Sequence, residues 1–369
     1  MRRVRIAAAL AALTAVALPA HAAAADAPPS FYGVVSQGNL DHGDFARMAD
    51  GRVGTLRVAL PWAQMDPTPV PEDYDWSNFD ATVTQATKHG IEVLPTVYTV
   101  PQWVSLLEGC DKPPGGPCAI TPPHTQLGLA AWRSFLGAAA RRYGPGGLFW
   151  TLHPELAQSP IRVWQIWNEQ NSPGFFQPRP DVDTYVDLLS AASEAIRGQD
   201  PGAEIVLGGL FRYPLGGRDG GLRATDFLRQ LYAHPGIDAA FDGVAIHPYA
   251  GKLLGVKRQV RRVVRVVRGA GDSQAAIWIT EIGWASGGKR TPLNPGPEGQ
   301  AQRLTQAFRY FTRERERLAI RAVLWYAWRD VSEADSRCKW CARSGLFPVG
   351  SLAEPKPAWA SFLSFTGGA

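Results

Sequence analysis

Residues 161–169 read IRVWQIWNE, and this short segment carries the clearest information about the architecture of the chain. Its first six residues are mostly β-branched or aromatic, which is typical of a strand buried on both faces of a parallel sheet. Such a strand should not end in an unpaired carboxylate, because burying a charge without a partner is costly. Glu169 therefore indicates that this strand ends in a site where a carboxylate is used.

Seven other segments have a similar strand-like composition, and amphipathic helix-like segments separate them. The eight candidate strands are FYGVVS at 31, TLRVALPW at 55, IEVLPTVYTV at 91, IRVWQIWNE at 161, EIVLGGLF at 204, DGVAIHPYA at 242, AIWITEIGW at 276 and RAVLWYAW at 321. Eight strand-then-helix units predict a single-domain α/β fold, the closed parallel (β/α)8 or TIM barrel, over residues 26–369. An open doubly wound sheet is disfavoured, because the first strand continues into QGNLDHGDF and not into a glycine-rich phosphate turn.

Residues 1–25 differ in composition from the rest of the chain. Three arginines precede an apolar run that ends at Leu18, and Ala-His-Ala follows at 20–22. This pattern predicts a secretory signal peptide cleaved near Ala22, with a retained anchor as the alternative, and Arg2-Arg3 leaves the export route open. The apolar run is too short to span a bilayer, so we expect a secreted protein without a membrane span.

The charge balance gives no support to nucleic-acid binding. Removal of the leader takes away three arginines and no acidic residue, so the formal net charge falls from +5 to about +2. The one basic block, VKRQVRRVVRVVRG at 256–269, places its basic residues on one helical face and its valines on the other. We interpret it as a solvated helix face in preference to an anion site.

The four cysteines are Cys110, Cys118, Cys338 and Cys341, which is consistent with two disulfides in an oxidising compartment. Three connectivities are possible, and we favour the local pairs. The spacing of Cys338 and Cys341 also occurs in zinc knuckles and redox pairs, but no second Cys or His pair accompanies it.

In barrels of this kind the chemistry lies at the carboxyl ends of the strands. The polar and aromatic side chains expected there are Arg57, Trp62, Trp103, Asn168, Glu169, His247, Tyr249, Glu281, Trp325 and Trp328. Glycoside hydrolysis needs two facing carboxyl groups, and Glu169 and Glu281 come from the fourth and seventh strands of the ring. We infer a separation of about 5–5.5 Å, which goes with a covalent intermediate and retention of configuration.

The neighbouring residues favour different protonation states for the two glutamates. We expect Arg57 and Tyr249 to keep Glu281 ionised, because a nearby cation and a donated hydrogen bond both lower a carboxylate pKa. Glu169, without an evident cation, could keep the raised pKa that a general acid needs.

Three further side chains are expected to bind substrate. Asn168 could bind a sugar 2-hydroxyl together with Glu169 only if the strand bulges or ends there, because consecutive strand residues point to opposite faces. His247 should be a hydrogen-bonding wall residue, with a core histidine as the alternative. Trp328 could stack against a pyranose ring, whereas we expect core or rim packing for the other tryptophans, Trp62, Trp103 and Trp325.

Five motifs together resemble the retaining glycoside hydrolases of clan A, nearest to the family 39 and family 5 barrels. They are VWQIWNEQN, VAIHPYA, WITEIGWAS, LRVALPWAQMDP and VLPTVYTVPQW. The resemblance spans nearly the whole mature chain and implies that Glu169 is the acid/base and Glu281 the nucleophile. It also implies substrate-site roles for three residues, Arg57, His247 and Tyr249. The chain departs from the pattern at Gln170, where proline is frequent in the clan.

The residues and the resemblance together predict a secreted retaining glycosidase that acts on β-linked carbohydrate, with no cofactor and no metal. A barrel that binds carbohydrate without cleaving it is the alternative, although such a protein would usually lose one carboxylate. A metal-dependent hydrolase would need clustered His and Asp at the strand ends. The chain has only seven histidines, and no His-x-His follows a strand.

Overall fold

The computed structural model describes residues 27–112, 116–211, 220–336 and 338–369. The expected signal peptide, residues 1–25, lies outside these ranges. None of the helices within them has the length and apolar character that crossing a bilayer requires.

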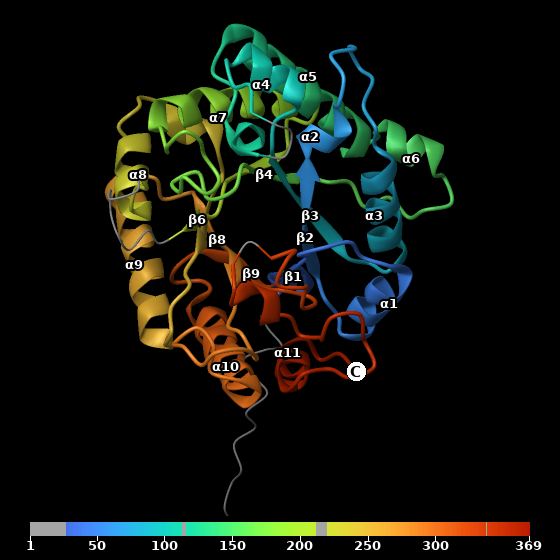
Figure 1. Ribbon diagram of the computed structural model, residues 1–369, viewed down its shortest axis with the longest axis vertical. Coiled ribbons are helices and arrows are strands. Elements are labelled where there is room, and N and C mark those ends of the chain that lie inside the picture. Colours follow the sequence, from blue (N-terminus) through green and yellow to red (C-terminus); the bar gives the residue numbers. More distant parts are fainter. Residues whose placement is uncertain (1–26, 113–115, 212–219, 337) are drawn as a thin grey trace, which may run out of the picture.

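The strands form one parallel sheet that closes on itself, as Figure 1 shows in a view into the ring. Their order is β5-β4-β3-β2-β1-β9-β8-β7-β6, and an additional pairing of β5 with β7 completes the ring. The bounds are β1 Tyr32–Val35, β2 Thr55–Pro61, β3 Glu92–Tyr98, β4 Val163–Ile166, β5 Glu204–Leu207, β6 Leu210–Phe211, β7 Gly243–His247, β8 Ala276–Ile282 and β9 Ile320–Tyr326. The predicted (β/α)8 barrel is therefore confirmed.

The fifth barrel strand, predicted as one segment, consists of two pieces. Both β5 and β6 pair with β7, and Gly208 and Gly209 lie between them. A Cβ atom on Gly209 would lie 1.9 Å from Nε2 of His247, far inside van der Waals contact. Glycine is required here because the His247 ring occupies the space that a side chain would need.

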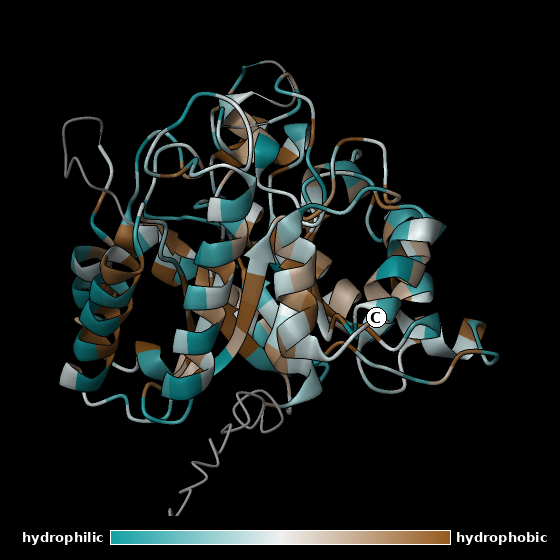
Figure 2. Ribbon diagram, turned by 90° about the horizontal axis from the view of Figure 1, so that it is seen from below, coloured by the Kyte–Doolittle hydropathy of each residue, from teal (hydrophilic) through white to brown (hydrophobic). Residues whose placement is uncertain are grey.

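The helices form an outer layer around the strands, and Figure 2 shows the apolar colour concentrated on the strands in the interior. Their bounds are α1 His42–Asp50, α2 Trp62–Met65, α3 Ser77–Lys88, α4 Gln102–Leu107, α5 Gln126–Tyr143, α6 Leu148–Leu152, α7 Val182–Arg197, α8 Ala224–Leu231, α9 Leu253–Gly269, α10 Pro297–Glu314 and α11 Pro357–Thr366. Short 3-10 helices are η1 Pro29–Phe31, η2 Pro117–Ile120, η3 Ile237–Ala240 and η4 Cys341–Arg343.

Helix α9 contains the basic block and has the predicted two faces. Val256, Val260 and Val263 are buried against the barrel, whereas Arg261 and Arg262 are exposed. The apolar face accounts for the position of the helix, and the arginines lie on its solvent side.

The interior of the barrel changes from apolar to polar toward the carboxyl ends of the strands. Seven residues form a buried apolar cluster inside the barrel, separate from the main core: Val35, Leu94, Val206, Ala245, Trp278, Ala322 and Leu324. Two positions after members of this cluster come Thr96 on β3, His247 on β7 and Thr280 on β8, all buried. Side chains two apart on a strand share a face, so these polar groups lie above the apolar cluster, at the end where barrels carry their chemistry.

The two disulfides join the predicted local pairs, Cys110–Cys118 and Cys338–Cys341. The segment that contains the second pair is also held by an ion pair, with Nζ of Lys356 2.6 Å from a carboxylate oxygen of Asp330. Each of these links closes a loop within the long segment that follows β3 or β9.

We predict that Gly33→Ala lowers the free energy of unfolding by about 1–3 kcal/mol, the usual cost of overpacking a core. A Cβ atom there would lie 2.2 Å from the backbone oxygen of Thr55 and 2.5 Å from Cδ2 of Leu324. The matched control is Gly269→Ala at the end of α9, where a Cβ meets nothing within 4 Å and alanine favours the helix. Denaturant unfolding followed by circular dichroism measures both, and equal midpoints for the two variants would contradict the prediction.

Candidate active site

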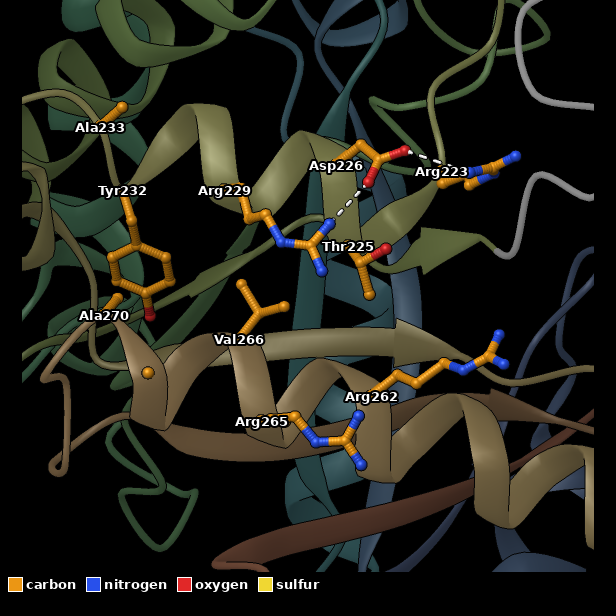
Figure 3. A pocket seen from close by; sticks show the side chains of 11 residues that line it. Arg223, Thr225, Asp226, Arg229, Tyr232, Ala233, Arg262, Arg265, Val266 and Ala270 are labelled. Carbon is orange, nitrogen blue, oxygen red and sulfur yellow. Dashed lines mark hydrogen bonds and ion pairs between the residues drawn. The ribbon is translucent and has the colours of Figure 1, made fainter.

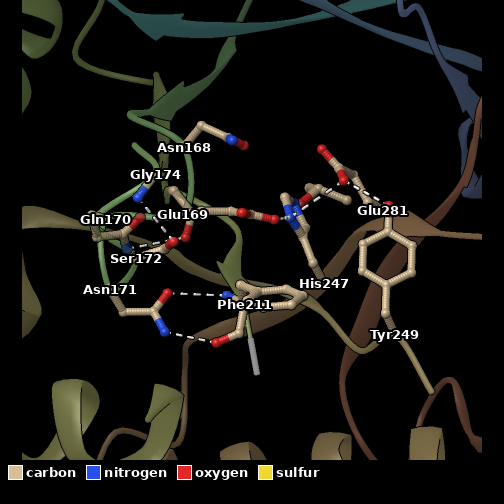
Figure 4. Close-up of polar contacts among 12 residues, drawn as sticks. Asn168, Glu169, Gln170, Asn171, Ser172, Gly174, Phe211, His247, Tyr249 and Glu281 are labelled. Carbon is tan, nitrogen blue, oxygen red and sulfur yellow. Dashed lines mark hydrogen bonds and ion pairs between the residues drawn. The ribbon is translucent and has the colours of Figure 1, made fainter. Parts of the chain in front are cut away.

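Asn168 and Glu169 lie just beyond the end of β4, which stops at Ile166. The backbone then enters the left-handed region at Trp167 (φ 71°) and again at Glu169 (φ 43°), so the alternation of a regular strand is broken. Both side chains can therefore turn toward the barrel axis. The strand ends before them, as was expected if both residues are to contact substrate. Figure 4 shows Glu169 directed toward His247.

Glu281 reaches the same space from β8 because that strand is irregular. Its pairing with β9 shifts register between Ile279 and Ile282. Thr280 and Glu281 are consecutive, yet both make buried hydrogen bonds to groups in the barrel interior. A bulge of this kind re-aims a side chain, and here it brings a second carboxylate into the site.

The two carboxyl groups are close together, with His247 between them (Figure 4). Nδ1 of His247 lies 2.8 Å from Oε1 of Glu169 and 3.4 Å from Oε2 of Glu281. The three potential ligand atoms of these residues all lie within 4.8 Å of one another. Both glutamates are largely buried, with side-chain exposures of 14% and 11%.

Arg57 on β2 connects the segment after β4, which carries Glu169, with β8, which carries Glu281. Its Nη1 donates to Oε1 of Glu281 at 2.7 Å, and its Nη2 donates to Oδ1 of Asn168 at 2.8 Å. Its Nε donates to Oε1 of Gln165 at 2.6 Å. The planar guanidinium thus holds the end of β4 and the bulge of β8 in a defined relation.

The ionisation of Glu281 results from opposing effects. Burial raises the pKa of Glu281 above its ordinary value, and Arg57 and the Tyr249 hydroxyl, which donates to Oε2 at 2.7 Å, lower it. Both expected contacts are present and lower the pKa as expected, but burial is the larger effect, so the pKa of Glu281 is raised overall. Burial and the charge of Glu281 raise the pKa of Tyr249 well above its usual range, which keeps its hydroxyl a donor.

His247 is fully buried and neutral in this setting. Burial is the main cause that lowers the pKa of His247 well below its ordinary value, and the charge of Arg57 adds to it. The ring nitrogens contact Glu169 and Thr280, so His247 is a hydrogen-bonding residue of the site and not an isolated core histidine.

Gln165 and Thr280 belong to the same polar network and were not predicted from the sequence. Oε1 of Gln165 accepts from Arg57 and from Thr96, and its Nε2 donates to Thr280 at 3.2 Å. The sequence feature that could have indicated the role of Gln165 was a single glutamine within the apolar run of β4. A lone polar residue in a strand is too common for that signal to be decisive.

A cavity of about 170 Å³ opens beside Glu281 and Arg57. Its aromatic lining comes from Tyr98, Phe175 and Tyr326, which were not predicted as site residues.

Trp328 does not present a face to this cavity, which corrects the expectation that it stacks against a sugar. Its side chain is fully buried, and its Nε1 donates to Oδ1 of Asp44 at 2.7 Å. The indole packs against Phe347 and Trp359, so no ring face is left for a ligand. The expected packing roles hold for the remaining tryptophans: Trp62 and Trp325 are fully buried, and Trp103 is half-buried.

Gln170, the departure from the clan pattern, is buried and ties the segment after β4 to the break in the fifth strand. Its Nε2 donates to the carbonyl oxygen of Gly208 at 3.1 Å. The loop is therefore held by a hydrogen bond at the position where proline would restrict the backbone.

Within the described ranges, Glu169, His247 and Glu281 are the acidic and imidazole side chains close enough together to hold a metal ion. A cation there would compete with the guanidinium of Arg57, which already lies 2.7 Å from Glu281. Three side chains are few ligands for a metal ion. The buried charge of Glu281 is already compensated by the guanidinium of Arg57.

Larger grooves occur on the outside of the barrel. One of about 770 Å³ lies between α8 and α9 and is lined by Arg223, Arg229, Arg262 and Arg265 (Figure 3). Asp226 there contacts Arg223 and Arg229. This open groove holds no facing carboxylates and has the character of a solvated helix surface, so the smaller cavity within the barrel mouth is the candidate active site.

No protein-family model and no curated protein sequence matches the chain. Solved structures do resemble it. A family 39 glycoside hydrolase from Bacteroides cellulosilyticus WH2 superposes with a TM-score of 0.62 at 18% identity, over 93% of this chain and 64% of that one. An intracellular xylanase from Thermoanaerobacterium saccharolyticum JW/SL-YS485 gives 0.62 at 18% identity, over 93% and 97%.

A monomeric β-xylosidase from Caulobacter crescentus CB15 gives a TM-score of 0.60 at 15% identity, over 90% of this chain and 67% of that one. The chain thus spans about two thirds of the length of two of these three structures. At these identities the similarity is evidence for a barrel fold shared with glycosidases, and it does not extend to a particular substrate.

We predict that Tyr249→Phe raises the pKa of Glu281 further, because the variant removes a hydrogen bond that stabilises the ionised carboxylate. The measurement is a pH titration of protein labelled with ¹³C-glutamate, in which Glu281→Gln identifies the resonance. The control, Tyr232→Phe, removes a partly buried hydroxyl that donates to Asp272 at 2.8 Å outside the barrel, and should leave the titration unchanged. A pKa of Glu281 that stays the same or falls in Tyr249→Phe would contradict this account.

Proposed function

We propose that this protein is a secreted glycoside hydrolase that cleaves β-linked O-glycosyl bonds with retention of configuration. Glu281 acts as the nucleophile and Glu169 as the general acid/base. The observation that carries the proposal is that one carboxylate oxygen of each glutamate lies within 4.8 Å of one oxygen of the other. Retaining enzymes need a short separation of about 5–5.5 Å, whereas inverting enzymes leave about 6.5–9.5 Å for a water molecule.

In the first step, an ionised oxygen of Glu281 attacks the anomeric carbon, and Glu169 gives its proton to the leaving oxygen. Arg57 and Tyr249 each contact one oxygen of Glu281, which holds the carboxylate in a fixed orientation. Because burial raises the pKa of Glu281, these two contacts provide the stabilisation that the attacking anion needs. The raised pKa expected for Glu169 stays a prediction.

In the second step, Glu169 removes a proton from water, and the water attacks the glycosyl-enzyme intermediate. The neutral ring of His247 contacts the same carboxylate and can donate a hydrogen bond to it without placing a cation there. Glu169 can therefore alternate between its acid and base forms as the two steps require.

Asn168 is suited to hold the sugar beside the reacting carbon. Its Oδ1 accepts from Arg57, which turns its amide nitrogen away from the guanidinium. A donor at this position can bind the 2-hydroxyl group, whose hydrogen bonds strengthen in the transition state of glycoside hydrolysis.

The cavity and its walls fit one ring of a saccharide. Its volume of about 170 Å³ is below the roughly 300–1,000 Å³ of pockets that enclose whole drug-sized ligands. Tyr98, Phe175 and Tyr326 supply aromatic surface of the kind that packs against the apolar faces of sugars. The names of the similar structures, which include xylosidase, xylanase, galactosidase and glucosidase, support a β-linked carbohydrate as the substrate class.

Secretion is the part of the proposal that depends on the leader sequence. The two disulfides are compatible with an oxidising compartment outside the cytoplasm.

A carbohydrate-binding barrel without catalytic activity is the second candidate. It would have no need for two largely buried carboxylates that lie within 4.8 Å of each other and each have partners of their own. A chelator such as EDTA should leave the activity unchanged, which distinguishes the proposal from a metal-dependent hydrolase.

We predict that Glu281→Ala lowers turnover by at least about 10³-fold while the fold stays intact, because the nucleophile is lost. Added azide should restore part of the rate and give a glycosyl azide of inverted configuration, since the small anion fits the space of the missing carboxylate. Aryl-glycoside assays and NMR of the product measure both effects. Glu316→Ala, at an exposed glutamate, is the control, and wild-type rates in Glu281→Ala would refute the assignment.

We predict that Glu169→Ala slows natural substrates much more than activated aryl glycosides. A good leaving group departs without a proton, so the first step no longer depends on the general acid, which otherwise contributes about 10²–10⁴-fold. The measurement is kcat/KM over a series of aryl glycosides of different leaving-group pKa. A slope equal to that of the wild type would exclude Glu169 as the acid.

A further inference from the structure

A chain of hydrogen bonds, all but the last of them buried, leads from Arg57 to Glu169 through the interior of the barrel. Arg57 contacts Gln165 at 2.6 Å, and Gln165 contacts Thr280 at 3.2 Å. Thr280 then contacts Nε2 of His247 at 3.1 Å, and Nδ1 of His247 contacts Glu169 at 2.8 Å. Each contact joins side chains of different strands or strand ends.

The amide of Gln165 has only one orientation that satisfies its neighbours. Arg57 can only donate, so it must face the amide oxygen. The carbonyl oxygen of Leu207 can only accept, and it lies 3.1 Å from Nε2 of Gln165. The same nitrogen therefore donates its second hydrogen to Oγ1 of Thr280.

This orientation leaves the hydroxyl hydrogen of Thr280 available for His247. Oγ1 of Thr280 accepts from Gln165, and among the described residues its other hydrogen-bond partner is Nε2 of His247. A buried hydroxyl needs an acceptor for its hydrogen. Nε2 meets this need only if it carries no hydrogen itself, so the single N–H of the neutral ring is on Nδ1.

The other side of the ring leads to the same tautomer. Nδ1 faces oxygens of two carboxyl groups, Glu169 at 2.8 Å and Glu281 at 3.4 Å. An ionised carboxylate can only accept, and a bare ring nitrogen would repel it. The other groups near His247 are Arg57, which lowers its pKa, and Tyr249, whose hydroxyl donates to Glu281.

We propose that Thr280, oriented by Gln165, is a positioning residue that keeps the N–H of His247 on Nδ1 and directed at Oε1 of Glu169. With Oε1 accepting, the acidic proton of Glu169 is carried on Oε2. It therefore cannot be held in an O–H···N bond to the imidazole. This inference rests on the proposed function of Glu169 and assigns roles to two residues outside the expected catalytic set.

The tautomer is tested directly by NMR of protein labelled with ¹⁵N-histidine, in which protonated and bare ring nitrogens have well-separated shifts. A spectrum of His247→Asn identifies the His247 signals. We expect protonated Nδ1 and bare Nε2 in the wild type. In Thr280→Val the Nε2–H form should become populated, because Nε2 loses its donor and a protonated Glu169 can then donate to Nδ1. Thr280→Ser should restore the wild-type spectrum.

The kinetic consequence is tested with the same variants. Thr280→Val should lower kcat/KM about tenfold on substrates with poor leaving groups and much less on activated aryl glycosides, since only part of the general-acid contribution is lost. The limb of the pH profile that reports protonation of Glu169 should move, and Thr280→Ser should return both properties toward the wild type. Thr55→Val is the matched control, because it removes a buried hydroxyl that donates to the backbone of Ser30 away from the site.

Two results would overturn the proposal. One is a wild-type spectrum with the proton on Nε2. The other is a Thr280→Val variant that, like Thr55→Val, changes only stability and keeps the wild-type tautomer and leaving-group dependence. The NMR experiment needs no substrate, so a failure of the proposed glycosidase activity is distinguishable from a failure of this inference.

Discussion

The ion pair between Arg57 and Glu281 is the interaction on which the geometry of the site depends. Both groups are buried, and burying either charge alone would be strongly unfavourable, so each requires the other. The remaining donors of Arg57 bind Asn168 and Gln165, which fixes the end of β4 relative to β8. The polar layer above the apolar interior of the barrel follows from this requirement, since every group that contacts Arg57 needs partners of its own.

The working groups are placed where the strands are irregular. A regular strand shows every second side chain to the interior, whereas the site uses the consecutive pairs Asn168–Glu169 and Thr280–Glu281. The first pair follows the end of β4, and the second lies in the shifted register of β8. The break between β5 and β6 serves the same purpose, because Gly209 leaves the space that the His247 ring fills.

Predictions from the sequence are correct where the order of strands decides which residues meet. Glu281, Arg57 and Tyr249 could be placed together because a closed barrel of known strand order brings their strand ends to one mouth. The same reasoning failed for Trp328, since the position after a strand end does not reveal which way a side chain turns. Gln165 was also missed, because its role appears only when its partners on four other strands are in place.

By itself, the sequence determined the barrel and the strands that carry the two glutamates, and it favoured the local cysteine pairs without excluding the other connectivities. These features follow from periodicity, spacing and chain order, which are local properties. Only the tertiary structure decided the balance of effects on the pKa of Glu281, the burial of Trp328 and the direction of the hydrogen bonds that reach His247. The reason is that burial and donor direction depend on groups from several strands at once, and no single segment of the chain contains that information.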